Sequence, residues 1–338
     1  MDMADRILDM TESGELFEPS LQRIKEKYLE LVKKYHPDSW ADPRASDVFD
    51  QITKLKDEAM ANLEQGIWKQ KNRISVEMKR GGWQSIDYSD YIEFELGNAY
   101  IGQTRIMYLI EEEHEEFYQN AIYRINNLSF ANDNMKKEFE LFLPRILKQG
   151  QARNDSLVLI LEKTDDEYRL TDIWQRLDKK IDARNTAWII SRLCSICCYL
   201  QFSHIAHNGI TMDNLFINPK EHTISLYGGW WYAVDEGDKL IGTTADVYDA
   251  MSDDCKTNKL AECDTDQEMV HEISKKLLDN DSLVFKVTDY TDIPPAMAAW
   301  IRNGTCSDAF KEFDNWNQTL DESWGARKFV ELKVPGIN

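Results

Sequence analysis

The most informative stretch for predicting the fold is His207-Asn-Gly-Ile-Thr-Met-Asp-Asn-Leu-Phe-Ile217, together with the segments on either side of it. A long apolar segment, residues 186–204, precedes the stretch and predicts a buried helix. Two short apolar runs, residues 215–217 and 223–226, predict a pair of strands joined by a turn. Residues 207–214 are therefore expected to form a loop that is held between a helix and a strand pair.

This stretch resembles the catalytic loop of protein kinases, whose pattern is His-Arg-Asp-Leu-Lys-Pro-Glu-Asn followed by two apolar strand residues. The resemblance extends over residues 88–330 and implies a bilobal fold. We expect a small strand-rich lobe over residues 88–165 and a larger helical lobe over residues 166–338. The family places its metal-binding Asp-Phe-Gly thirteen residues after the Asn, and there this chain has Tyr227-Gly228-Gly229.

The two carboxylates that phosphoryl transfer requires are missing from this pattern. Gly209 stands where the family has the Asp that orients the attacking hydroxyl, and Tyr227 stands where it has the magnesium-binding Asp. Glycine offers no carboxylate, and a tyrosine with a pKa of about 10 is neutral at pH 7 and binds magnesium poorly. Asn214 is retained. The sequence thus indicates a pseudokinase with no catalytic residue, no metal and no cofactor, and it disfavours ATP and magnesium without excluding them.

The positions of the family's lysine and its partner acid also differ in this chain, and one alternative function stays open. Residues 116–125 are expected to end a strand at Arg124, where the family has the lysine of Val-Ala-Ile-Lys. A helix over residues 134–148 offers Glu138 or Glu140 as its partner acid. A guanidinium does not replace an ammonium on a phosphate. The alternative is a nucleotide-binding or active serine/threonine-kinase-like enzyme, in which Asp213 and Asn214 keep a nucleotide or metal contact.

The N-terminal part of the chain contains a second informative motif. Residues 21–35 and 47–67 have apolar residues at helical spacing, and Tyr35-His36-Pro37-Asp38-Ser39 lies between them. Pro37 fixes the backbone of this loop. The helix before it concentrates basic residues in an otherwise acidic chain, among them Lys25, Lys33 and Lys34.

Residues 21–65 resemble the J-domain of DnaJ-type co-chaperones, in which two antiparallel helices present a basic face and a His-Pro-Asp loop to a DnaK-type ATPase chaperone. The resemblance implies that His36, Pro37, Asp38 and the three lysines bind such a chaperone. Ser39 departs from the family, which usually has lysine there, and residues 3–10 are hard to recognise as the family's first helix. We expect an α+β protein: an all-α J-domain-like module over residues 1–68, joined to a pseudokinase that serves as a scaffold or client-recognition surface.

Charge and composition bound the remaining possibilities. The chain has 40 Lys+Arg against 60 Asp+Glu, a net charge of −20, which argues against nucleic acid as a partner. No apolar run approaches the length of a membrane span, and no signal peptide pattern is present. Residues 69–87 are basic, contain a glycine pair and predict a linker. We expect a cytoplasmic protein whose client is unknown.

Two further patterns are interpreted as structural. Cys194-x-x-Cys197 lies in an apolar helical segment, so the thiols are expected in the core rather than on a metal. His207 is expected to hydrogen-bond the backbone, and Trp230 and Trp231 are expected to pack the interior. Residues 327–333 are expected to lie along the helical lobe. A structural or assembly protein, in which both modules are interaction domains, is a further alternative.

Overall fold

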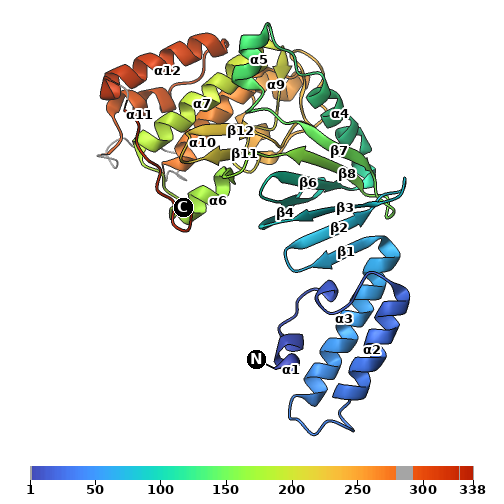
Figure 1. Ribbon diagram of the computed structural model, residues 1–338. Coiled ribbons are helices and arrows are strands. Elements are labelled where there is room, and N and C mark those ends of the chain that lie inside the picture. The colour runs from blue at the N-terminus through green and yellow to red at the C-terminus, as the bar shows by residue number, and fades with distance from the viewer. Residues whose placement is uncertain (1, 279–291, 327, 338) are drawn as a thin grey trace. The chain divides into compact units, whose positions relative to one another are not determined.

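The computed structural model describes residues 2–278, 292–326 and 328–337. The chain divides into two compact units (Figure 1), one made of residues 1–115 and 147–162 and the other of residues 116–146 and 163–338. No helix in these described ranges combines the length and the hydropathy that a membrane span requires.

A helical hairpin begins the first unit, as the apolar spacing predicts. Its helices are α2 (Leu21–Tyr35) and α3 (Ala45–Gln65). Each helix buries one apolar stripe, and the stripes share one core: Ile24, Leu31 and Tyr35 from α2, and Val48, Ile52, Leu55 and Ala59 from α3. Burial of such side chains stabilises the pair by about 1.5–3 kcal/mol each.

A short first helix, α1 (Met3–Leu8), packs on the same core, although the sequence did not reveal it clearly. The Arg44 guanidinium, at the start of α3, is ion-paired with Asp2, Asp5 and Asp42. It lowers the pKa of Asp42 to about 2. Arg44 thereby fastens the N-terminal segment to the start of α3, while the one-turn helix η1 (Ser13–Glu15) connects α1 with α2.

The prediction of a linker over residues 69–87 is wrong. These residues belong to an antiparallel sheet of β1 (Ile67–Gln70), β2 (Arg73–Glu77) and β3 (Trp83–Asp87). Side chains alternate along β2, so that Ile74 and Val76 are buried, at 1% and 0% exposure, between exposed or half-buried polar neighbours. The glycine pair is the turn between β2 and β3 and not a flexible connection.

A five-stranded antiparallel sheet completes the first unit. Its order is β4-β5-β6-β8-β7, and its strands are β4 (Asp90–Phe94), β5 (Gly97–Ile101), β6 (Arg105–Ile110), β7 (Ile146–Gln151) and β8 (Leu157–Glu162). Met107, Val158 and Ile160 of this sheet share one core with Ile74 and Val76 of the three-stranded sheet. The expected strands over residues 91–96, 104–110 and 156–162 are confirmed.

The expected strand over residues 116–125 is wrong, because these residues form the helix α4 (Glu115–Asn126). Its buried side chains, Tyr118, Ala121 and Ile125, are three and four residues apart, which is helical spacing. A shorter helix, α5 (Asp133–Phe139), follows, and the chain then enters β7. The helix expected over residues 134–148 therefore ends early.

The rest of the second unit is mainly helical, as expected. The helix α7 (Ala183–Phe202) is buried along most of its length and packs against α10 (Cys263–Leu277) and α12 (Ala309–Trp324). The strands β11 (Leu215–Asn218) and β12 (Thr223–Leu226) form the expected pair after the loop. The remaining elements are β9 (Tyr168–Arg169), α6 (Leu170–Arg176), β10 (Ile205–Ala206), β13 (Val234–Asp235), α8 (Ala245–Ala250), α9 (Asp253–Asn258) and α11 (Pro295–Arg302).

The order of the elements agrees with the expected arrangement of a strand-rich part followed by a mainly helical part. Two helices, α4 and α5, lie between the strand β6 and the strand pair β7–β8, and farther along the chain the long buried helix α7 leads to a loop and to the strand pair β11–β12. The change of unit at Glu162–Lys163 lies close to the lobe boundary expected at residue 165, but α4 and α5 belong with the helical unit.

Candidate functional site

A buried acid, Asp266, holds the backbone of the loop that resembles a kinase catalytic loop. Both carboxylate oxygens of Asp266 accept backbone N–H groups, from His207 at 2.6 Å and from Asn208 at 3.0 Å. Asp266 is 1% exposed, and burial raises its pKa to about 7. Sequence reasoning missed this residue; the available signal was an acid at helical spacing from the apolar residues Met269, Val270 and Ile273.

Two glycines of the site lie in direct backbone contact. A Cβ atom on Gly209 would lie 2.9 Å from the Gly229 Cα atom and 3.0 Å from its carbonyl oxygen. Conversely, a Cβ atom on Gly229, where φ is +81°, would lie 2.7 Å from the Gly209 carbonyl oxygen. The backbone of residues 228–229 therefore fills the space that a side chain at position 209 would need.

Asn214, the one retained residue of the kinase pattern, is used to hold these turns together. The Asn214 side-chain amide donates to the Gly209 carbonyl oxygen at 2.9 Å. The backbone carbonyl oxygen of Asn214 accepts the N–H groups of Tyr227 and Gly228 at 3.2 and 3.3 Å. A Cβ atom on Gly228 would come within 2.1 Å of the Asn214 Oδ1 atom. Asn214 therefore ties the loop to the glycine turn.

Tyr227 is buried at 3% exposure, and its hydroxyl group is fully engaged. The hydroxyl donates to Glu167 Oε2 at 2.7 Å and accepts the backbone N–H of Thr164 at 3.0 Å. Glu167 also accepts the Ser225 hydroxyl at 2.7 Å. Burial raises the pKa of Tyr227, so that it is a neutral hydrogen-bonding group at pH 7.

Lys163 and Glu167 belong to the same buried network, where the chain re-enters the second unit at Lys163. Both are 4% exposed. The Lys163 ammonium donates to the carbonyl oxygens of Thr164 and Glu167 at 2.9 and 2.8 Å. Burial lowers the pKa of Lys163 and raises that of Glu167. No sequence pattern pointed to this buried network, because Lys163 and Glu167 are distant from the kinase-like loop along the chain.

Asp213 lies on the loop beside Asn214, but its carboxylate faces a different partner. Its Oδ1 atom is 3.3 Å from the Arg169 guanidinium, which also binds Asp172 at 2.6 Å. The Asp213 side chain is 59% exposed. The structure therefore places Asp213 in a surface ion pair.

The expected roles of Arg124 and Glu138 are not found. Arg124 lies near the end of α4 rather than on a strand, and its guanidinium is ion-paired with Asp235. Glu138 is exposed on the next helix, α5. The strand that directly precedes α4 is β6, whose sequence Arg-Ile-Met-Tyr-Leu-Ile contains no lysine. The reason for the error is the helical spacing of residues 118–125, which we interpreted as a strand.

His207 is structural, but its ring does not hydrogen-bond the backbone as expected. The ring is fully buried, and neither nitrogen has a partner among the described residues. It packs edge-on against Trp230, with ring centroids 4.7 Å apart. Burial lowers the pKa of His207 to about 3. Trp230 and Trp231 are 0% and 2% exposed, so both pack the interior as expected.

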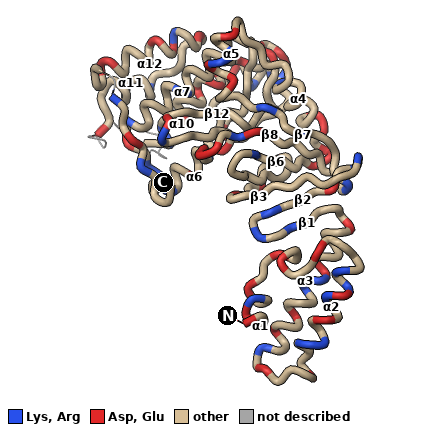
Figure 2. The backbone as a smooth tube through the Cα atoms, viewed as in Figure 1, with Lys and Arg blue, Asp and Glu red and all other residues tan. Residues whose placement is uncertain are grey.

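The His36-Pro37-Asp38 loop protrudes between α2 and α3. The His36 ring packs edge-on against Phe49 at 5.2 Å and accepts the Asp38 N–H at 3.2 Å. The Asp38 side chain is 91% exposed. Basic residues, drawn blue in Figure 2, lie along α2, and Lys25, Lys33 and Lys34 are all exposed.

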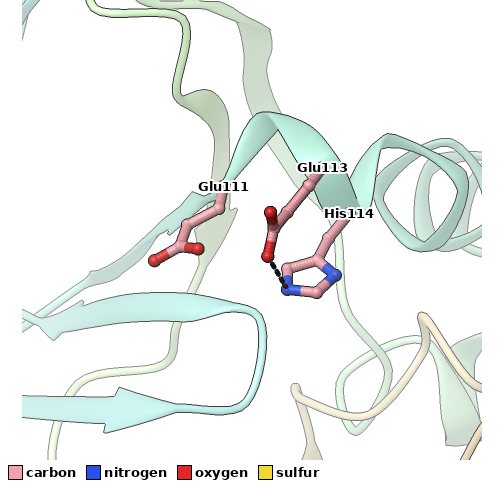
Figure 3. Close-up of side chains that lie close together, drawn as sticks. All are labelled: Glu111, Glu113 and His114. Atoms are coloured by element: carbon pink, nitrogen blue, oxygen red, sulfur yellow. Dashed lines mark ion pairs between the residues drawn. The ribbon is translucent and has the colours of Figure 1, made fainter.

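Two groups of side chains carry atoms of the kind that bind metals, namely the buried cysteines and one surface cluster. Cys194 and Cys197 are 4% exposed, and burial raises the pKa of both thiols, which disfavours the thiolate that a metal needs. Figure 3 shows Glu111, Glu113 and His114, whose ligand atoms lie within 4.8 Å of one another. Both glutamates are exposed, and acidic side chains at the start of a helix are favoured by the helix dipole alone.

The chain matches no family model and none of the curated proteins. Among solved structures it is similar to "Structure of vaccinia related kinase 3", with a TM-score of 0.49 and 13% sequence identity, over 73% of this chain and 90% of that one.

Proposed function

We propose that this chain is a non-catalytic, kinase-like interaction protein. The observation that carries the proposal is the direct contact between the backbones of Gly209 and Gly229. Phosphoryl transfer needs one carboxylate to orient the nucleophile and another to hold magnesium. Position 209 has no carboxylate, and the backbone of residue 229 occupies the space in which one would lie.

The second carboxylate position supports the same conclusion. Tyr227 is turned toward Glu167 and Thr164 and makes two hydrogen bonds there. A neutral phenol with both interactions satisfied has no charge to offer a cation. Asn214 is likewise occupied in holding the Gly209 carbonyl oxygen. The positions that would bind metal and nucleophile therefore serve packing.

Incubation of the purified chain with magnesium and γ-labelled ATP tests this proposal. We expect no labelled product, and no rise in the thermal unfolding midpoint at millimolar ATP and magnesium. Asn214→Ala and Asp213→Ala serve as paired variants, because one residue holds the glycine turn and the other lies in a surface ion pair. Transfer by the unmodified chain that disappears in Asn214→Ala, with the fold intact by circular dichroism, would refute the proposal.

We further propose that the helical hairpin recruits a DnaK-type ATPase chaperone, with the kinase-like part as a scaffold or client-recognition surface. Three features support this. The Asp38 carboxylate projects into solvent, and His36 is fixed by Phe49 and by the Asp38 N–H. The exposed lysines of α2 adjoin the loop in a chain of net charge −20. An exposed acid beside a basic face offers charge-assisted hydrogen bonds to a partner.

The ATPase rate of a DnaK-type chaperone, measured with and without the full chain, tests recruitment. We expect stimulation that is lost in His36→Gln and Asp38→Asn and weakened in Lys33→Gln. Lys137→Gln is the matched control, because it removes one exposed lysine from α5. Absence of stimulation by the unmodified chain, or an equal effect of Lys33→Gln and Lys137→Gln, would contradict this part of the proposal.

A further inference from the structure

The end of the chain, residues 328–335, is an extended segment that lies on the helical unit; we refer to it as the tail. Its side chains alternate: Leu332 and Val334 are each 6% exposed, while Lys328, Glu331 and Lys333 are exposed. Figure 1 shows this segment, in dark red, ending near α6. The expected course of residues 327–333 along the helical lobe is confirmed for residues 328–333, and residue 327 lies outside the described residues.

An aromatic stack fixes the beginning of the tail. The His222 ring, on the turn between β11 and β12, lies between two rings that are nearly parallel to it. Trp188 of α7 is 4.4 Å away at 5°, and Phe329 of the tail is 4.1 Å away at 15°. Phe329 is itself 68% exposed, so it covers His222 as an outer layer.

The other end of the tail is held by one polar contact. The Arg176 guanidinium of α6 donates to the Pro335 carbonyl oxygen at 3.5 Å. Residues 328–334 form no strand with any described element. A hydrogen bond between the Val330 backbone and His222 adds to this contact. The tail is thus held by side chains at alternate positions and by isolated polar contacts, and a competitor that displaces it need not break a hydrogen-bonded ladder.

We propose that the tail is a displaceable intramolecular ligand. The surface beneath it, defined by Arg176, Trp188 and His222 and called here the tail-docking surface, takes an extended peptide segment of a protein partner. The fitting segment has an aromatic residue followed by apolar residues at every second position, which is the pattern of Phe329-Val-Glu-Leu-Lys-Val334. Side-chain positions that alternate in this way give an extended peptide its specificity.

The bound tail lowers the apparent affinity of the tail-docking surface for a competing peptide. A segment tethered to its own binding site is present at an effective concentration in the millimolar range. A free peptide at micromolar concentration therefore occupies the surface only after the tail is weakened. The proposal depends neither on the absence of phosphoryl transfer nor on chaperone recruitment, and its test measures neither.

Fluorescence anisotropy of a labelled peptide with the sequence of residues 328–338 provides the test, on full-length protein throughout. The double variant Leu332→Asp/Val334→Asp replaces two buried apolar side chains by carboxylates, whose burial is unfavourable, so that the tail no longer stays bound. We expect the peptide to bind this variant at least tenfold more tightly than the unmodified chain. A peptide that carries the same two Asp substitutions should not bind, and adding His222→Ala to the double variant should abolish binding.

The outcomes separate clearly. Equal binding to the unmodified chain and to the double variant, or no binding to the double variant, overturns the proposal. If the double variant does not fold by circular dichroism, Phe329→Ala replaces it, because this change removes a ring that is largely exposed. We then expect a smaller gain in peptide affinity that again requires His222, and the absence of any gain overturns the proposal equally.

Discussion

Replacing Gly229 by alanine measures how tightly the glycine turn is closed. Gly229 has φ +81°, and a Cβ atom there would lie 2.7 Å from both the Gly209 carbonyl oxygen and the His207 Cε1 atom. The left-handed backbone conformation costs alanine about 1–2 kcal/mol. Displacing two tightly packed neighbours adds about 1–3 kcal/mol. We therefore expect Gly229→Ala to lower the free energy of unfolding by about 2–5 kcal/mol.

Gly237→Ala is the matched control, because it has the same backbone conformation without the contacts. Its φ is +83°, and a Cβ atom there would meet no atom within 4 Å. The change should cost only about 1–2 kcal/mol. Urea denaturation followed by circular dichroism gives both values, and any effect of alanine on the unfolded chain cancels between them. Equal destabilisation by the two variants would refute the argument that backbone fills the site.

Three further predictions follow from buried groups. Tyr227→Phe removes one hydrogen-bond partner from Glu167 and one from the Thr164 N–H, and it should lower the free energy of unfolding by about 1–3 kcal/mol. Tyr248→Phe is the control, because Tyr248 is half-exposed, and it should change the midpoint of urea denaturation little. His207 has a folded-state pKa of about 3, below its unfolded value of about 6.5, so its contribution is full above pH 6.5 and is lost as the pH falls toward 3. Protonation of His207 should lower the free energy of unfolding by on the order of 3 kcal/mol at pH 4. His207→Phe should abolish this decrease, so that the free energy of unfolding varies less between pH 7 and pH 4; an unchanged pH dependence would show that His207 does not cause the decrease. Ile74→Ala should cost about 2–5 kcal/mol and increase tryptic cleavage within residues 69–80; no change in either would mean that these residues do not form a packed sheet.

Local pattern was sufficient for several elements of the fold. The helix α2 begins and ends within the predicted range, and β11 and β12 follow the loop as expected. The pattern failed where two influences competed. Aromatic and β-branched residues in α4 favoured a strand, although its buried residues have helical spacing. In β2, basic residues and the following glycine pair concealed the alternation of Ile74 and Val76.

Residue identity alone establishes which chemical groups are absent from the kinase-like site. Gly209 and Tyr227 have no carboxylate in any fold, and the identity of a side chain needs no coordinates. What replaces the two carboxylates, in contrast, follows only from how the chain packs. The contact of Gly209 with Gly229, the bond of Tyr227 to Glu167 and the anchoring of the loop by Asp266 join residues that are 20 to 60 positions apart. Periodicity reports only which face of an element is buried, whereas such contacts depend on how whole elements pack.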